Sequence, residues 1–426
     1  MMQIYHANII YTPQSSRFEV VPHGYVVVDG GKVEGVYREL PARFADCPVR
    51  EWGDRLLIPA MNDMHVHAPQ YRNQGIAMDE ELLPWLENYT FPEEMKYADR
   101  AYAGRMYRHF VRDLWRHGTM RVVAFASVHL ESTRLLMRLL EQAGMGGRVG
   151  KVNMNRHCPE ALQERVDEAC EACEALVREF EREDARVRPI VTPRFIPSCT
   201  PELLRACGEM ARRYGLPVQS HLSENLGEIE WVKELEPESR HYADAYDRYG
   251  LLGQTPTVMA HCVWTDGDEL ETLRERGVMV AHCPTSNFNL ASGMAPVRRF
   301  IEAGIPVGLG SDVSGGHDLS IFRMMVYAIQ VSKMHYQRDR SCAFLSLSEA
   351  FWMATKSAGS FFGQVGSFEP GYDFDALVID DGELMIDAGY SLLERLERFV
   401  YIGDDRHIVA RYCQGRPVPD PKVLNE

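Results

Sequence analysis

Short apolar segments alternate with longer amphipathic segments over residues 62–365. Within ALQERVDEACEACEALVREFERED (residues 161–184), apolar positions recur at three- and four-residue steps, which predicts an amphipathic helix. The shorter segments are rich in Val, Ile and Met and are bounded by Gly and Pro, as strands are. This alternation is typical of βα units built around a parallel sheet.

Eight of the short segments have the length and flanking residues of strands. They are residues 60–67, 119–127, 147–155, 188–195, 216–223, 256–262, 278–284 and 305–312. Eight βα units in about 300 residues predict a TIM-type (β/α)8 barrel, in which reactive groups lie at the C-terminal ends of the strands.

The two ends of the chain have a different pattern, with strand-like segments punctuated by Gly, Pro and Asp. At the N-terminus, Asp29, Gly30 and Gly31 separate two apolar segments and predict a hairpin turn. Neither end has enough strands to form a core alone, so we expect both to pair into one small β-sandwich-like domain. The predicted organisation is 1–61 and 366–426 in the small β domain and 62–365 in the barrel.

Composition limits the partners and the compartment. A hydrophobic fraction of 45% is ordinary for a globular protein, and a net charge of -15 argues against nucleic acid or an anionic membrane surface as partner. A small neutral substrate is left open. The opening residues MMQIYHANIIYT do not resemble a signal peptide, and the ten cysteines are thinly spread, which predicts free thiols in a soluble cytoplasmic protein.

Residues with metal-binding chemistry lie at the ends of the predicted strands. His65 and His67 close the first strand at i, i+2 spacing, so both imidazoles project from one face. The fifth strand supplies His221, the sixth His261 and the eighth Asp312. Because these ends meet at the barrel mouth, imidazole and carboxylate ligands are expected to converge on a borderline metal such as Zn²⁺, with a position left for water.

Two further residues near these strand ends carry side chains that could take part in the site. Glu224 follows His221 by three residues, which places a carboxyl group in the barrel mouth. His282 closes the seventh strand, and we expect it to shape the wall of the site rather than to bind the metal.

The order H-x-H, His, His, Asp resembles that of the amidohydrolase superfamily, and GSFEPGYDFDALV resembles its return into the small domain. Two-metal members carry a carboxylated Lys at the end of strand four, where this chain reads IVTPRF. Lys151 is interpreted as lying at the start of strand three, on the wrong face. The resemblance therefore implies one metal per subunit, held by His65, His67, His221 and Asp312, as in the deaminase branch.

Longer strings resemble the guanine deaminase family in particular. They are HAPQY, LLPWLENYTFPEE, VTPRFIPSC, QSHLSEN, AHCPTSN and YIGDDRHI. The resemblance implies that Gln70 and Arg194 hydrogen-bond guanine, that Phe195 packs on its ring and that Trp85 helps to close the pocket. Guanine offers acceptors at O6 and N7, which suit an amide and a guanidinium. The resemblance also implies a homodimer.

A mechanism follows from these assignments as a hypothesis. Asp312 takes a proton from the metal-activated water, His261 polarises the developing oxyanion or shares that proton, and Glu224 protonates N3 of guanine before ammonia leaves. Fe²⁺ in place of Zn²⁺ is left open, because both accept these ligands. The alternatives are a deaminase of another aminopurine or of a triazine-like heterocycle, and, from another class, a non-catalytic scaffold.

Overall fold

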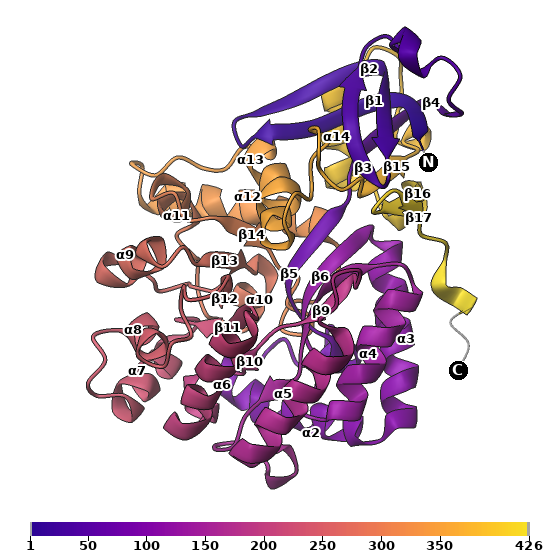
Figure 1. The fold of residues 1–426 in the computed structure, drawn as a ribbon. Helices are drawn as coiled ribbons and strands as arrows, with labels where there is room; N and C mark the ends of the chain where they lie inside the picture. The colour runs from indigo at the N-terminus through magenta and orange to yellow at the C-terminus, as the bar shows by residue number, and fades with distance from the viewer. Residues whose placement is uncertain (1, 424–426) are drawn as a thin grey trace.

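The computed structural model describes residues 2–423, which form an α/β structure. Strands from the two ends of the chain lie together at one end of the molecule, and parallel strands flanked by helices make up the rest (Figure 1). The α/β class predicted from the sequence is confirmed.

The terminal strands form one seven-stranded mixed sheet. Its members, in sequence order, are β1 (Gln3–Gln14), β2 (Arg17–Asp29), β3 (Lys32–Tyr37), β4 (Val49–Pro59), β15 (Ala376–Ile379), β16 (Ile408–Cys413) and β17 (Arg416–Pro417). Their spatial order is β17-β16-β15-β4-β1-β2-β3, so β15 joins the C-terminal strands to the N-terminal ones through β4. This is the pairing of both ends that the sequence predicts, while the division into separate domains stays a prediction.

The predicted hairpin at Gly30 and Gly31 is confirmed. Asp29 pairs with Lys32 across a two-residue turn, and both glycines have positive φ angles, 57° and 87°. Two consecutive residues with positive φ make the type of turn that matches the twist of the flanking strands, and glycine adopts it without a steric cost.

Every strand predicted for the middle of the chain is present, and all of them run parallel. The bounds are β5 (Met61–His67), β6 (Thr119–Phe125), β7 (Gly146–Gly150), β8 (Val152–Asn153), β9 (Val187–Pro189), β10 (Thr192–Pro193), β11 (Val218–Leu222), β12 (Thr257–His261), β13 (Met279–His282) and β14 (Val307–Leu309). The third and fourth predicted strands are each interrupted, as β7/β8 and β9/β10.

The parallel strands do not form one continuous ladder. They make two four-stranded sheets, β5-β6-β7-β9 and β11-β12-β13-β14, and a separate pair β10-β8. One bridge, Val191 to Val218, links the fourth and fifth strands, and the eighth meets the first through Asp312 N donating to His65 O over 2.8 Å. The structure therefore supports the parallel α/β arrangement, but its strands do not form the closed barrel that the sequence predicts.

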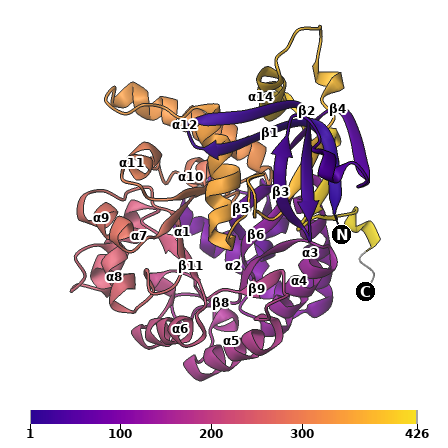
Figure 2. The same ribbon diagram turned by 45° about the horizontal axis from the view of Figure 1, so that its top comes forward.

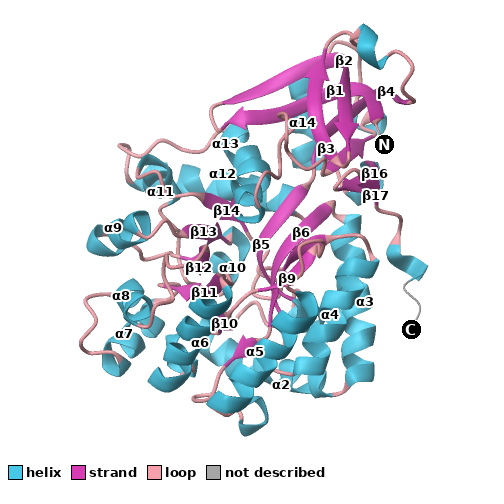
Figure 3. Ribbon diagram, viewed as in Figure 1, coloured by secondary structure: helices cyan, strands magenta, loops and turns pink. Residues whose placement is uncertain are grey.

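Helices pack around the parallel strands and beside the terminal sheet (Figures 2 and 3). They are α1 (Leu82–Trp85), α2 (Phe91–Glu94), α3 (Arg100–Arg116), α4 (Leu130–Gln142), α5 (Val166–Phe180), α6 (Pro201–Tyr214), α7 (Leu226–Leu235), α8 (Tyr242–Arg248), α9 (Gly267–Glu275), α10 (Pro284–Asn289), α11 (Val297–Glu302), α12 (Ile321–Arg338), α13 (Leu347–Trp352) and α14 (Leu392–Ile402). The bounds of α6 have clear local causes: Thr200 caps its N-terminus by accepting from Leu203 N, Pro201 opens it, and Gly215 ends it at φ 63°.

One helix lies within the C-terminal part of the predicted small β domain, where no helix was predicted. α14 falls within the predicted C-terminal β segment, and Ser391 with Glu394 forms a capping box at its start. None of the helices within residues 2–423 is long and apolar enough to cross a membrane.

Candidate active site

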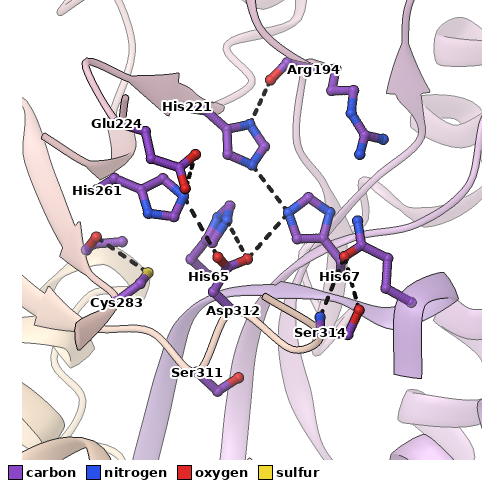
Figure 4. Close-up of polar contacts among 12 residues, drawn as sticks. His65, His67, Arg194, His221, Glu224, His261, Cys283, Ser311, Asp312 and Ser314 are labelled. Carbon is purple, nitrogen blue, oxygen red and sulfur yellow. Dashed lines mark hydrogen bonds and ion pairs between the residues drawn. The ribbon is translucent and has the colours of Figure 1, made fainter. Parts of the chain in front are cut away.

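Five of the predicted site residues converge at the carboxyl ends of the parallel strands (Figure 4). His65 and His67 alternate along β5 and project to the same side, as their spacing predicts. His221 lies on β11, His261 ends β12, and Asp312 follows β14. Residues far apart in sequence meet here because parallel strands present the same end to one edge.

The side-chain atoms are close enough to share one ion. His65 Nε2 lies 3.1 Å from Asp312 Oδ1, and His67 Nε2 lies 3.4 Å from the same oxygen. His67 Nε2 and His221 Nε2 are 3.1 Å apart. Two sets of three residues each offer ligand atoms within 4.8 Å of one another: His65, His221 and His261, and His65, His67 and Asp312.

The unsatisfied nitrogen atoms of these histidines fit a metal ion. His65 Nε2 and His261 Nε2, which both face the cluster, are buried without a hydrogen-bond partner. Such orphaned polar atoms are rare in folded proteins and call for a ligand. The cluster of imidazoles and one carboxylate is a donor set suited to Zn²⁺ or Fe²⁺.

Hydrogen bonds behind the cluster hold two of the rings in place. His221 Nδ1 donates to the carbonyl oxygen of Arg194 over 2.6 Å, which leaves the Nε2 lone pair facing the site. His261 Nδ1 lies 2.9 Å from Asn287 Oδ1, at the end of α10. Partners of this kind fix the tautomer and orientation of a metal-ligating histidine.

The protonation states also suit metal binding. Burial lowers the pKa of His65, and lowers those of His67 and His221 so far below the ordinary value that these two imidazoles are neutral. His221 reaches solvent only in part, through the pocket. Burial alone would raise the pKa of Asp312, but the attraction of His65 and its neighbours holds it well below its usual range. Asp312 is therefore an anion.

Glu224 has the opposite character from Asp312. Its Oε2 lies 3.4 Å from His261 Nε2, and Oε1 accepts a hydrogen bond from Ser292 Oγ over 3.3 Å. Burial, and then repulsion by Asp312, raise the pKa of Glu224 well above the ordinary value. Two carboxyl groups in one site thus differ in environment, one suited to be a base and the other an acid.

Strained backbone is concentrated at these strand ends. Non-glycine residues with positive φ include Ser223 (46°), His261 (72°), Cys262 (48°) and Asp312 (46°). Conformations of this kind cost free energy and persist where the surrounding structure enforces them, most often at functional sites.

The residues implied in purine recognition line one pocket next to the cluster. Gln70 lies on the 3₁₀ helix Ala68–Asn73, Trp85 ends α1, and Arg194 and Phe195 follow β10. The pocket is lined by these four residues together with His67, Leu82, Leu86, His221, Glu224, Glu228, His261, Leu290, Asp312 and Gly315. The fold therefore brings together all the site residues singled out from the sequence.

Sequence reasoning missed two buried carboxylates at this pocket. Glu94 ends α2 and binds Arg194, and Glu228 on α7 accepts hydrogen bonds from Glu224 N and Tyr242 Oη. Both side chains are almost fully buried. A signal existed for Glu94, because FPEE closes one of the strings that resemble the guanine deaminase family.

Lys151 does not lie at the start of the third strand, so that interpretation of the sequence was wrong. The expectation of one metal per subunit, which it accompanied, stays a prediction. Lys151 follows the end of β7 rather than opening the strand, because pairing with β6 begins earlier, at Gly146. Its ammonium group binds Glu164 and the carbonyl of Val152. His282 is buried at the end of β13 with both ring nitrogens unpartnered, and its role as a wall residue stays a prediction.

The sequence profile of the amidohydrolase family matches residues 56–418. The matched stretch contains every residue assigned to the site. The chain therefore belongs to the amidohydrolase family, the class that its fold and its site define.

Relatives that match nearly the whole chain are more specific. The chain is 34% identical to guanine deaminase of Dictyostelium discoideum, with 98% of each chain covered, and 32% identical to that of Escherichia coli (strain K12), covering 95% of this chain and 93% of that one. The crystal structure of guanine deaminase from C. acetobutylicum with guanine bound in the active site has a TM-score of 0.97 and 48% identity, covering 98% of this chain and 100% of that one. Within the amidohydrolases, the chain belongs to the guanine deaminases.

Proposed function

We propose that this enzyme hydrolyses guanine to xanthine and ammonia with one metal ion held by His65, His67, His221 and Asp312. The observation that carries the proposal is the convergence of these ligands, with Glu224 beside them, at the end of a pocket lined by Arg194 and Gln70. Membership of the guanine deaminases supports guanine as the substrate.

The donor set supports a single Zn²⁺ ion, and Fe²⁺ is the alternative. When bound, such an ion supplies Lewis-acid chemistry that lowers the pKa of a coordinated water towards about 7. Strand four ends in Arg194 and not in a lysine, and Lys151 is held by Glu164, which supports one metal rather than two.

The chain's own residues supply the proton transfers. Asp312 is an anion whose Oδ2 lies 3.7 Å from His261 Nε2, so it accepts the proton of the attacking water while His261 polarises the developing oxyanion or shares that proton. Glu224 is held protonated by burial and donates to N3 of guanine, which makes C2 more electrophilic. The proton held by Asp312 then passes to the departing amine and ammonia leaves, while the proton of the new C2 hydroxyl returns to Glu224, which yields xanthine and restores both carboxyl groups.

The pocket walls support recognition of a flat base. Arg194 and Gln70 offer N–H donors to the O6 and N7 acceptors, and Phe195 and Trp85 offer apolar ring surface. Leu82, Leu86 and Leu290 complete an apolar lining that excludes water from the reacting atoms.

The experiment that tests the function is a substrate panel with metal-loaded protein. Guanine, adenine, 2,6-diaminopurine and an aminotriazine are incubated with the enzyme, ammonia release is followed, and products are separated by chromatography. Rapid conversion of guanine to xanthine with adenine untouched is the expected result. Turnover of another heterocycle in preference to guanine would favour the alternative substrate class, and inactivity towards all of them in protein that carries its metal would favour a scaffold.

Two further properties belong to this proposal. All ten cysteines are unpaired, which supports a reducing compartment such as the cytoplasm. The exposed side chains of Trp264, Phe288 and Met334 line one groove, and exposed apolar patches mark interfaces, which supports a homodimer. Light scattering on the purified enzyme measures the oligomeric state.

A further inference from the structure

Gln70 and Arg194, the two residues proposed to read the purine edge, share one carboxylate. Glu94 Oε1 accepts from Gln70 Nε2 over 2.9 Å and from Arg194 Nη1 over 3.0 Å, and Glu94 Oε2 accepts from the same Nη1 over 2.7 Å. The three side chains are buried, with exposed fractions of 1–2%. A charge-assisted network of this kind, shielded from water, holds its members rigidly.

The network fixes which way the Gln70 amide faces. A carboxylate only accepts hydrogen bonds, so the amide nitrogen of Gln70 must face Glu94. On its other side, Gln70 Oε1 accepts from Ser314 N over 3.3 Å and from Ser314 Oγ over 3.4 Å. The oxygen is thereby occupied by the protein, and the second N–H of Gln70 is the group left for a ligand.

The same carboxylate sets the position of Arg194. The ion pair uses Nη1, so Nε and Nη2 remain as donors on a residue that lines the pocket. The guanidinium carbon lies 5.2 Å from the centre of the Phe91 ring, and Phe91 and Glu94 are the two ends of α2. Helix α2 thus holds the guanidinium at two points, through the carboxylate of Glu94 and through the ring face of Phe91.

We propose that Glu94 is the positioning residue that determines specificity at the C6 edge of the purine. By holding Gln70 and Arg194 with N–H donors toward the base, it makes the pocket accept a 6-oxo purine and reject a 6-amino purine, whose amine would face a donor. Its negative charge also cancels that of Arg194, so the edge of a neutral base meets N–H donors that carry no net charge. This inference rests on the proposed function.

Glu94→Gln tests the inference, because an amide can donate where a carboxylate cannot. With Gln at this position the Gln70 amide is free to turn its oxygen toward the base. Guanine and 2,6-diaminopurine carry the same C2 amine and differ at C6 and in the proton on N1, so the ratio of their kcat/KM values reports the reading of the C6–N1 edge. We expect the ratio to fall by about tenfold or more, with KM for guanine raised more than kcat is lowered.

Glu93→Gln is the matched control. Glu93 is the neighbouring residue on α2 and equally buried, but its hydrogen bonds are to Lys96 and Tyr102 instead of Gln70 and Arg194. Its substitution is expected to leave the selectivity ratio within about twofold, the effect of a remote change. Melting temperature and metal content are measured for each variant to establish that it is folded and loaded.

Glu94→Asp gives a second test that does not depend on recovery of the Gln variant. Aspartate keeps an acceptor-only group but withdraws it by one methylene, so KM for guanine should rise by about threefold or more while the selectivity ratio is retained. An unchanged ratio in folded Glu94→Gln, or a ratio lost equally in the Asp variant, overturns the inference. Failure of the wild-type enzyme to release ammonia from guanine overturns the proposed function instead.

Discussion

His67 Nε2 and His221 Nε2 face each other at 3.1 Å across the candidate metal site. His221 Nδ1 donates to the Arg194 carbonyl, so its Nε2 is a bare lone pair, and burial keeps both rings neutral. Without a metal, His67 Nε2 can donate to this lone pair, but when both nitrogens bind a metal they present lone pairs that repel each other at this distance. A cation between these ligand atoms and Asp312 relieves that repulsion.

Metal removal should therefore destabilise the folded enzyme as well as inactivate it. Because the ion binds only the folded site, a thousandfold excess of free metal over Kd is worth about 4 kcal/mol of stability. Chelation should lower the melting temperature, and Zn²⁺ should restore it. His65→Ala should lose metal by elemental analysis, whereas His6→Ala, on the terminal sheet, should retain it. A metal-free protein that melts at the same temperature would contradict this.

Glu224→Gln should keep the metal and lose turnover. Glutamine preserves the size of the side chain but carries no acidic proton for N3, and loss of a general acid costs about 100-fold or more in kcat. Steady-state kinetics with elemental analysis checks both parts, and Glu230→Gln, exposed on α7, serves as the control. Near-normal kcat in Glu224→Gln would rule out its assignment as the proton donor.

Glu228 should make stability depend on pH. Burial, and then repulsion by Glu224, raise its pKa from 4.5 to about 7 in the folded chain. Between these two values the folded state binds more protons than the unfolded state, so stability falls as pH rises through this interval, by about 3 kcal/mol in all.

Glu228→Gln should remove that part of the pH dependence, since the amide imitates the protonated acid at every pH. Relative to wild type, the variant is expected to gain stability progressively from pH 5 to pH 8 in denaturant unfolding of metal-loaded protein. The comparison between two metal-loaded proteins cancels contributions of the metal ligands. Parallel stability curves across this range would refute the assignment.

Arg194 and Glu94 should behave as one unit in stability as well as in recognition. Arg194→Met leaves the Glu94 carboxylate buried without its partner, which costs about 3 kcal/mol. The double variant with Glu94→Gln removes both charges and should be less destabilised than the sum of the two single variants. Denaturant unfolding of the four proteins measures the coupling, and strictly additive values would show that the pair is not coupled.

The sequence was informative where chemistry follows a periodic pattern. The i, i+2 spacing of His65 and His67, and the placement of His221, His261 and Asp312 after apolar segments, predict their convergence without knowledge of the fold. Glu94 was marked only by its place in the string LLPWLENYTFPEE, and its role could not be predicted because its partner, Arg194, lies 100 residues away. The sequence contains a signal for helix α14 in the Ser391–Glu394 capping box, but the segment lies between strand-like segments of the C-terminal part, which drew attention away from it.

Closure of the strand ring was beyond the sequence for a physical reason. The pattern of apolar segments identifies strands, but the hydrogen bonds between the fourth and fifth strands, and between the eighth and first, depend on how the two sheets curve. In the structure those two junctions rest on a few backbone contacts, such as Val191 N to Pro217 O.

The pairing of β15 with β4 has a consequence for synthesis on the ribosome. Ala376 lies opposite Pro59 and Leu377 opposite Ile58. Strand β4 is therefore synthesised long before β15, the strand that pairs with its edge. Until then β4 presents an open, apolar edge, the kind of edge that recruits other chains. Messages that stop short of β15 should therefore yield aggregating product, even though every metal ligand has already been translated.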